Sequence, residues 1–141
     1  MKWTDCMKEK VKAIRPDNER AKAMTELAVK RLNSIARRRQ TEDPEFIVED
    51  YYESIKELTT ALLFSRGYKS YSHECLISFL QEFHPEFGKD ELELINQMRE
   101  IRNDIQYRGE PLASGFLKRR EADIKGVIDK LAKTVEKTVR G

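Results

Sequence analysis

The spacing of apolar residues in the C-terminal half limits the possible folds more than any other feature of this chain. Between residues 89 and 107, apolar side chains recur every three or four positions, at Leu92, Ile95, Met98, Ile101 and Ile105. This spacing places them on one face of an α-helix and predicts that the face is buried. Only 6 glycines and 4 prolines occur among 141 residues, which favours long helices over a sheet with many turns. We therefore expect an all-α fold.

The same period recurs along the rest of the chain, and residues that begin or end helices separate the periodic segments. The predicted fold is an antiparallel bundle of four long helices with a short additional helix, in a single domain over residues 1–141. Residues 1–16 form an N-terminal short helix or arm, and residues 17–141 form the bundle. Because its apolar face is complete, we expect the helix that ends near residue 107 to be central. The helices are expected over residues 1–15, 17–40, 45–66, 72–83, 89–107 and 113–139.

The charge balance and the two cysteines argue against several classes of function. With 27 Lys and Arg against 25 Asp and Glu, the net charge is only +2, so any contact with nucleic acid must come from a local patch. Cys6 and Cys75 are far apart in sequence and form no CxxC pair, so we expect neither a metal site nor a disulfide, and Cys75 should be a small core residue. No cofactor is expected. Without an apolar run of about 18 residues or a signal region, the chain is expected to be cytoplasmic and not to span a membrane.

A cluster of polar residues closes the helix expected over residues 89–107. The stretch from Arg99 to Gly109 reads R-E-I-R-N-D-I-Q-Y-R-G, with three arginines, an Asn-Asp pair and a tyrosine. Such a cluster at the end of a core helix is either a solvated shoulder or a functional site. If it is a site, its candidate residues are Arg99, Arg102, Asn103, Tyr107 and Arg108.

Two other features leave alternatives open. The run from Arg37 to Arg39 ends a helix, where cations favour the negative end of the helix dipole, but it could instead form a phosphate-binding patch. His73 and His84 have no neighbours at metal-ligand spacing, so no metal site is expected. We expect His73 to face solvent, and it would serve as a catalytic base only if folding brings it to the polar cluster.

Two segments together resemble the HEPN family of small helical bundles. Residues 51–80, Y-Y-E-S-I-K-E-L-T-T-A-L-L-F-S-R-G-Y-K-S-Y-S-H-E-C-L-I-S-F-L, resemble the paired tyrosines of the family, a helix ending in a Gly-Tyr turn and a Ser-His step into the next helix. Residues 101–107, I-R-N-D-I-Q-Y, resemble the family motif of arginine, a polar residue, three more residues and histidine. Tyr107 stands where the family has histidine. The resemblance covers roughly residues 45–139.

The resemblance implies a metal-independent RNA-cleaving site at a two-fold dimer interface, with an arginine that stabilises phosphate charge and a histidine base. Similar family members often work beside a small nucleotidyltransferase as a toxin–antitoxin pair. Tyrosine is a poor base, because its ordinary pKa is about 10 and only about one ring in a thousand is ionised at neutral pH. We therefore expect a protein that binds nucleotide or RNA at a dimer cleft. The resemblance makes Arg102 and Tyr107 the candidate catalytic residues, and the candidate nucleotide-binding or RNA-binding residues are Arg99, Arg102, Asn103, Tyr107 and Arg108. An active ribonuclease toxin and a bundle used only for protein interaction are the alternatives.

The spacing of Arg102 and Tyr107 favours a dimer. Residues five apart on an ideal helix lie about 140° apart around its axis and about 7.5 Å apart along it. The two side chains therefore converge only if the helix end distorts or a second copy supplies one of them. We expect a homodimer whose interface includes residues 99–108. An anion, or a carboxylate such as Asp104 or Glu100, should separate the two copies of Arg102.

Overall fold

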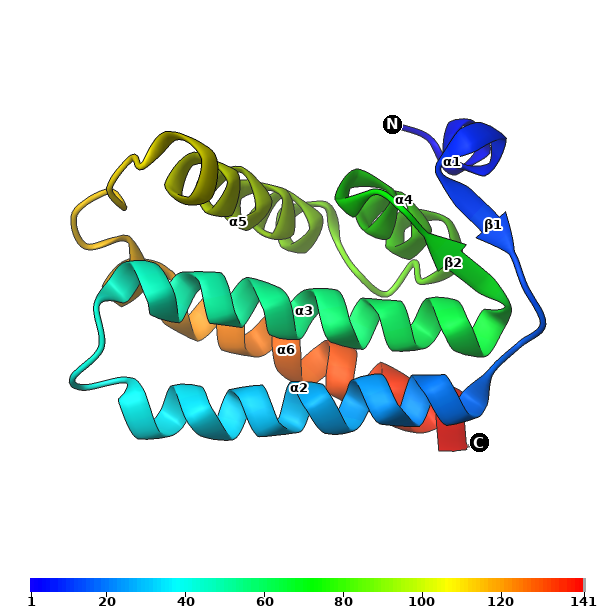
Figure 1. Cartoon of the computed structure of the whole chain (residues 1–141), viewed down its shortest axis with the longest axis horizontal. Coiled ribbons are helices and arrows are strands. Elements are labelled where there is room, and N and C mark those ends of the chain that lie inside the picture. Colours follow the sequence, from blue (N-terminus) through cyan, green and yellow to red (C-terminus); the bar gives the residue numbers. More distant parts are fainter. Residues whose placement is uncertain (141) are drawn as a thin grey trace.

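The computed structural model describes the backbone of residues 1–140 and the side chains of residues 1–139. Helices make up most of the chain, and the one sheet in this part is a two-stranded ribbon, so the all-α prediction is confirmed in its broad form. The expected bounds of the last five helices agree with the structure within a few residues. In chain order the elements are α1 (Trp3–Glu9), β1 (Val11–Ala13), α2 (Asn18–Arg38), α3 (Pro44–Arg66), β2 (Tyr68–Ser70), α4 (His73–Phe83), α5 (Lys89–Arg108) and α6 (Phe116–Arg140) (Figure 1).

The centre of the fold is α3, which packs against α2, α6, α5, α4 and β2 (Figure 1). Thirteen of its residues are buried. The expectation that α5 is central is wrong, because only Leu94, Ile95 and Met98 of that helix are buried. The apolar stripe of α5 thins toward its C-terminal end, where Ile101 and Ile105 are half-buried. A complete stripe predicts that one face is buried, whereas a central helix needs apolar residues on all sides.

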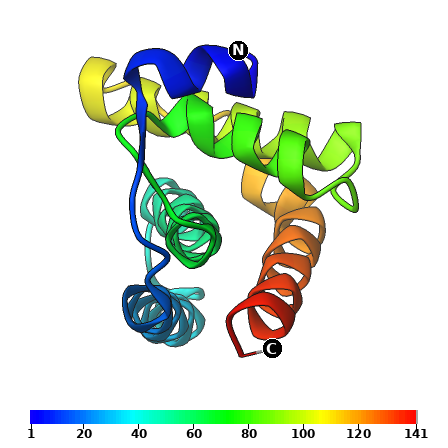
Figure 2. The same cartoon turned by 90° about the vertical axis from the view of Figure 1, so that its right-hand side faces the viewer.

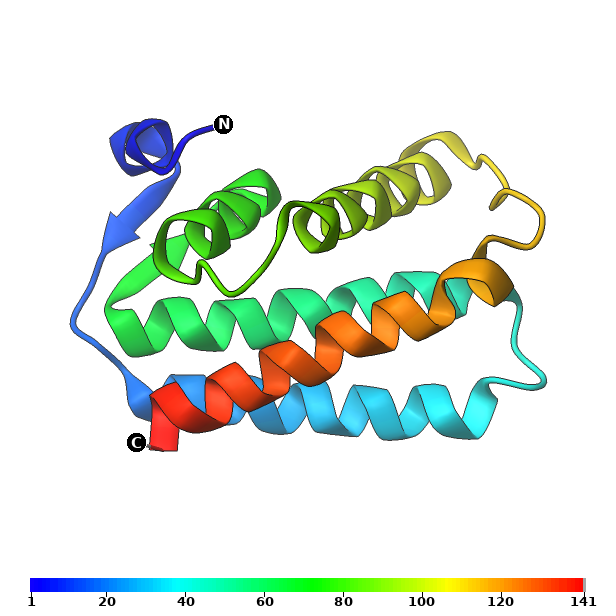
Figure 3. The same cartoon turned by 180° about the vertical axis from the view of Figure 1, so that it is seen from behind.

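The helices do not form a wholly antiparallel bundle. Figures 1 and 3 show α2, α3 and α6 lying along the long axis of the molecule, while Figure 2 shows α4 and α5 running across them. The direction of α2 is opposite to that of α3, but α6 runs in the same direction as α3. Consistent with this, the Tyr51 hydroxyl near the start of α3 donates to Glu121 Oε2 near the start of α6, at 2.8 Å. The antiparallel prediction therefore holds for α2 and fails for the pair α3 and α6.

The N-terminal segment departs most from the expected secondary structure. The helix predicted over residues 1–15 ends at Glu9, and Val11–Ala13 instead pairs antiparallel with Tyr68–Ser70. In β1, Val11 is buried while Lys12 and Ala13 are exposed, so the strand contacts the core through Val11. Trp3 and Met7 thus belong to α1, whereas Val11 belongs to β1.

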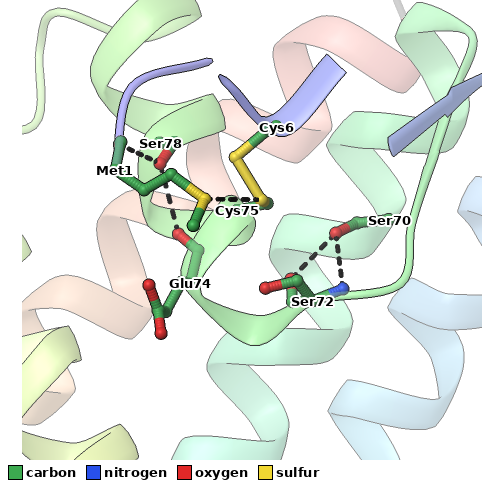
Figure 4. The surroundings of a disulfide bond; sticks show 7 residues. All are labelled: Met1, Cys6, Ser70, Ser72, Glu74, Cys75 and Ser78. Atoms are coloured by element: carbon green, nitrogen blue, oxygen red, sulfur yellow. Dashed lines mark hydrogen bonds between the residues drawn. A yellow bond between two sulfur atoms is a disulfide. The ribbon is translucent and has the colours of Figure 1, made fainter. Parts of the chain in front are cut away.

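Cys6 and Cys75 form a disulfide that joins α1 to α4, so the expectation of unpaired cysteines is wrong (Figure 4). The two residues are 69 positions apart in sequence. In the ribbon, however, Val11 lies opposite Ser70, and Cys6 precedes Val11 by as many residues as separate Ser70 from Cys75. Trp3 of α1 adds to the same connection, because it is buried against aromatic rings of β2 and α4. Strand pairing therefore creates a contact that sequence separation hides.

Gly67 ends α3 in the left-handed conformation, with a φ of 95°, as the sequence predicted. A β-carbon here would lie 2.8 Å from the carbonyl oxygen of Ile14, on the segment between β1 and α2. Gly67→Ala should therefore lower the free energy of unfolding by about 1–3 kcal/mol, measured by urea denaturation. Gly109→Ala is the matched control, because Gly109 has a φ of 62° in open space and should cost only about 1 kcal/mol. Equal losses in the two variants would contradict the close approach at Gly67.

Ion pairs account for two residues of the basic run at the end of α2. Arg38 pairs with Asp50 of α3, and Arg39 Nε lies 2.7 Å from Glu121 Oε2 of α6. Glu121 also accepts from Tyr51, and the hydrogen bonds from Arg39 and Tyr51 lower its pKa. These arginines fasten α2 to its neighbours, which favours a structural role for the run over a phosphate-binding patch.

Glu121→Gln should lower the free energy of unfolding by about 1–3 kcal/mol at neutral pH, because it removes hydrogen bonds to a charged group. The folded pKa of Glu121 lies below its ordinary value of 4.5, so the stabilisation is complete above that value and disappears as the pH falls through the folded pKa. Urea denaturation should therefore show a difference between wild type and variant that shrinks in acid. Glu136→Gln, at an exposed position of α6, is the control. A difference independent of pH would contradict the assigned contacts.

Candidate anion-binding site

Two arginines of α5 lie between α3 and α4. Arg99 and Arg102 are three residues apart, so they share one helix face, and their side chains are only 16% and 14% exposed. Arg102 Nε donates to Glu53 Oε1 of α3 at 3.2 Å, and Arg99 Nη1 lies 3.9 Å from Glu74 Oε1 of α4. The helix therefore presents two largely buried cations to its neighbours.

Three residues of α3 meet these arginines. Glu53 Oε2 lies 2.7 Å from Lys56 Nζ, so this carboxylate contacts both Lys56 and Arg102. Tyr52 is buried beside them. Burial raises the pKa of Tyr52 to about 12, although the charges of Arg99 and Arg102 act in the opposite direction. The helix thus supplies an aromatic ring, a carboxylate and a third cation to the same place.

His73 is the first residue of α4 and lies against Tyr52, with the two ring centroids 5.9 Å apart. It is half-buried, so the expectation that it faces solvent is wrong. Burial, followed by the charges of Lys56 and Arg102, lowers its pKa below the ordinary 6.5. The imidazole is therefore neutral at neutral pH, and one ring nitrogen can accept a proton.

Six residues from three helices form what we call the Arg102 cluster. It carries three fixed cations and one carboxylate, and Glu74 and Asn96 contact Arg99 at its edge. Within residues 1–139, Arg102 donates only through Nε, to Glu53, so its Nη groups remain available to an anion. Tyr52 is only 1% exposed and contributes its ring to the wall of the cluster. The cluster consists of Tyr52, Glu53, Lys56, His73, Arg99 and Arg102.

The structure brings together only part of the site predicted from sequence. Arg99 and Arg102 belong to the cluster, and the half-buried Asn103 follows them on α5. Tyr107 is 76% exposed, and Arg108 forms its ion pair with a residue of its own helix. These two residues lie at the exposed end of α5, away from Arg102, as a separation of about 140° around the helix predicts.

Sequence reasoning missed Glu53 and Lys56 as members of the site. Their spacing of three is typical of an ion pair along a helix, but nothing in the sequence connects Glu53 to Arg102, 49 positions later. Within the chain, the carboxylate beside Arg102 is that of Glu53, while the prediction that Asp104 or Glu100 separates two copies of Arg102 concerns the dimer and stays a prediction. Only the packing of α5 across α3 reveals this partner.

Other kinds of site find no support in the part of the chain that the structure describes. Within it, no group of three or more His, Cys, Asp and Glu side chains could hold a metal ion. None of the helices within residues 1–140 has an apolar stretch that could cross a bilayer.

No protein-family model matches the chain, and no curated protein matches its sequence. The resemblance to the HEPN family therefore rests only on residues 51–80 and 101–107. In the structure, the paired tyrosines lie on α3, the Gly-Tyr turn joins α3 to β2, and the Ser-His step begins α4. The arginine motif lies on α5.

Proposed function

We propose that this chain is a HEPN-like domain that binds the phosphate of a nucleotide or of RNA at the Arg102 cluster. The observation that carries the proposal is the convergence of Arg99, Arg102 and Lys56 beside Tyr52. A planar guanidinium matches phosphate oxygens, and it keeps its proton throughout the physiological pH range.

Glu53 limits how tightly an anion can bind. Its carboxylate occupies Arg102 Nε and Lys56 Nζ, so a phosphate must displace one or both of these contacts. Carboxylate and phosphate are both acceptors with negative charge, and they therefore compete for the same donors. The affinity for a nucleotide should consequently depend on both Arg102 and Glu53.

A homodimer would complete the proposed site. Within one chain, Tyr107 is exposed and does not reach Arg102. A second copy related by a two-fold axis could place its own Tyr107 against the cluster, through an interface that includes residues 99–108. There the tyrosine ring would stack on a nucleobase while the arginines hold the phosphate.

Sedimentation velocity with and without ATP tests this dimer. At protein concentrations on the order of tens of micromolar, we expect a dimer that ATP stabilises by mass action. Arg102→Glu should remove the effect of ATP without unfolding the chain, whereas Arg108→Glu, at the exposed end of the same helix, should retain it. A monomer under both conditions would contradict a shared site and would favour a bundle used only for protein interaction.

A small nucleotidyltransferase is the proposed protein partner, and the two would form a toxin–antitoxin-like pair. This part of the proposal rests on the HEPN resemblance alone. Coexpression with a nucleotidyltransferase encoded in a neighbouring reading frame should yield a complex that copurifies at a fixed ratio. Separate elution of the two purified proteins would contradict the pairing.

Ribonuclease activity is the second candidate function, and the position of His73 favours it. A neutral imidazole lies in the same cluster as Arg102, so a base and a phosphate-binding group are both present without Tyr107. The base would remove the proton of a 2′-hydroxyl while Arg102 stabilises the charge that develops on phosphate. The leading proposal, in contrast, expects little or no cleavage by the wild type.

Cleavage of a labelled single-stranded RNA separates the two candidates. If His73 is the base, His73→Gln should lower the rate by about a hundred- to ten-thousandfold, and His84→Gln should not. The wild-type rate should rise with pH about a midpoint below 6.5, because burial and Lys56 lower the pKa of His73. No cleavage at any pH would support binding alone. In that case, a gain of cleavage in Tyr107→His would indicate that only the base is missing.

A further inference from the structure

The outer face of the two-stranded ribbon carries two lysines that lie directly opposite each other. The opposed pairs are Val11 with Ser70, Lys12 with Lys69, and Ala13 with Tyr68. Val11 is buried, whereas Lys12 is exposed and Lys69 is half-buried, and both lysines lie on the face of the ribbon opposite to Val11. Like charges directly opposite each other destabilise an antiparallel pair. Stability of the ribbon therefore does not explain this choice of residues.

Basic residues outnumber acidic residues around the ribbon. Residues 10–16 and 66–72 contain five lysines and arginines but no aspartate or glutamate, and Glu9 and Asp17 border the first segment. The whole chain has nearly equal numbers of basic and acidic residues, 27 and 25. Within residues 1–139, Lys12 and Lys69 form no ion pair with any carboxylate. The ribbon is thus a local patch of uncompensated positive charge.

An exposed tyrosine lies next to these lysines. Tyr71 is 64% exposed, and Lys69 Nζ lies 5.4 Å from the centroid of its ring. The N–H of Tyr71 donates to the carbonyl oxygen of Lys10 at 2.8 Å, which extends the strand pairing and fixes the backbone. The backbone of Tyr71 is therefore held in place, and much of the surface of its ring is free for stacking. We call Lys10, Lys12, Lys69 and Tyr71 the ribbon surface.

We propose that the ribbon surface binds single-stranded nucleic acid, with phosphates at the lysines and a base stacked on Tyr71. Proteins that bind single strands combine cations along the phosphate backbone with aromatic rings that stack on unpaired bases. A duplex keeps its bases paired and out of reach of such a ring. An anionic membrane fits less well, because the ribbon surface has no aliphatic side chain to enter the lipid.

The surrounding structure holds these groups in fixed positions. A two-stranded ribbon is marginally stable alone, but the Cys6–Cys75 disulfide and the packing of Trp3 fasten both strands to α4. Fixed positions reduce the entropy lost when a ligand binds. This site uses different residues from the Arg102 cluster, so it goes beyond the proposed function and does not depend on it.

Fluorescence anisotropy with a labelled oligouridine of about 12 nucleotides tests the charge. The double variant Lys12→Glu/Lys69→Glu should weaken binding at least about tenfold. Lys12→Gln/Lys69→Gln should reduce the slope of log affinity against log salt by about 1.4, since each phosphate that a lysine neutralises adds about 0.7 to that slope. The control Lys30→Glu/Lys133→Glu lies at exposed positions of α2 and α6. It changes the net charge by the same amount as Lys12→Glu/Lys69→Glu and should have little effect on the affinity. Equal weakening by the two glutamate variants would overturn the proposal.

The role of Tyr71 is tested with the same oligonucleotide. Tyr71→Ser should weaken binding about fivefold or more, whereas Tyr71→Phe should bind as the wild type does, because stacking needs only the ring. The oligouridine annealed to its complement should bind less tightly than the single strand. Equal binding of duplex and single strand, or no effect of Tyr71→Ser, would overturn the proposal.

Two further measurements distinguish nucleic-acid binding at the ribbon surface from binding at the Arg102 cluster and from membrane binding. Arg102→Gln should leave the effects of the ribbon variants intact. Complete loss of oligonucleotide binding in Arg102→Gln, without any loss in the ribbon variants, would overturn the ribbon proposal and leave the Arg102 cluster as the binding site.

Vesicles containing phosphatidylserine should not bind to the protein detectably. Vesicle binding that the Lys12→Glu/Lys69→Glu change removes, without oligonucleotide binding, would assign the surface to a membrane and overturn the proposal.

Discussion

Replacing Cys6 with serine is expected to lower the free energy of unfolding by about 4 kcal/mol, the largest stability effect that this structure predicts. The disulfide to Cys75 closes a segment of 69 residues, so its main effect is to restrict the unfolded chain. The folded chain should keep its shape, because the ribbon pairing and the burial of Trp3 also hold α1 in place.

Urea denaturation of the oxidised wild type and of Cys6→Ser measures this difference. Dithiothreitol should lower the stability of the wild type to that of the variant and leave the variant unchanged. A thiol assay of the unfolded, non-reduced wild type should detect no free thiol. Equal stability of the oxidised wild type and Cys6→Ser, or two free thiols in the wild type, would contradict the assignment of the disulfide.

Arg102→Gln and Glu53→Gln are expected to change the affinity for ATP in opposite directions. Arg102→Gln removes a charged donor, and hydrogen bonds to charged groups contribute about 1.5–3 kcal/mol, so the affinity should fall about tenfold or more. Glu53→Gln removes the carboxylate that occupies Arg102 and Lys56, so the affinity should rise. Both changes conserve most of the side-chain size and should leave the fold intact.

Titration calorimetry with ATP, without added metal, measures both effects. Arg108→Gln is the matched control for Arg102→Gln, because it also removes an arginine of α5 but one that lies at the exposed end of the helix. Its affinity should equal that of the wild type. If Arg108→Gln weakened binding as much as Arg102→Gln, general charge rather than the cluster would be responsible. If Glu53→Gln weakened binding, that carboxylate would help to form the site rather than compete for it.

The helices were accessible from the sequence because their signals are local. Each signal acts within a few residues: the period of the apolar side chains, the N-terminal cap at Asp17 and the glycine at Gly67 that ends a helix. The structure shows both the cap and the glycine end. The candidate arginines were accessible for the same reason, since Arg99 and Arg102 share a face of a single helix. Such signals predict single helices, but they do not predict how the helices pack together.

The arrangement of the elements was not accessible, because it depends on contacts between distant residues. The ribbon joins three residues near the N-terminus to three that follow α3, and neither strand is long enough to show a clear alternation. The disulfide follows from that pairing. Glu53 and His73 join the cluster only because α5 and the start of α4 both meet α3. The central position of α3 also depends on packing, because helices from distant parts of the sequence cover it on several sides.

The Nε–Hε NMR signals of the arginine side chains, recorded as ATP is added, test the central claim most directly. Arg102→Lys identifies the Arg102 signal by removing it. We predict that this signal shifts progressively and saturates at the affinity found by calorimetry, while the signal of the exposed Arg108 stays unchanged. If the signals of Arg99 and Arg102 did not move at ATP concentrations that saturate binding, the Arg102 cluster would not be the anion-binding site.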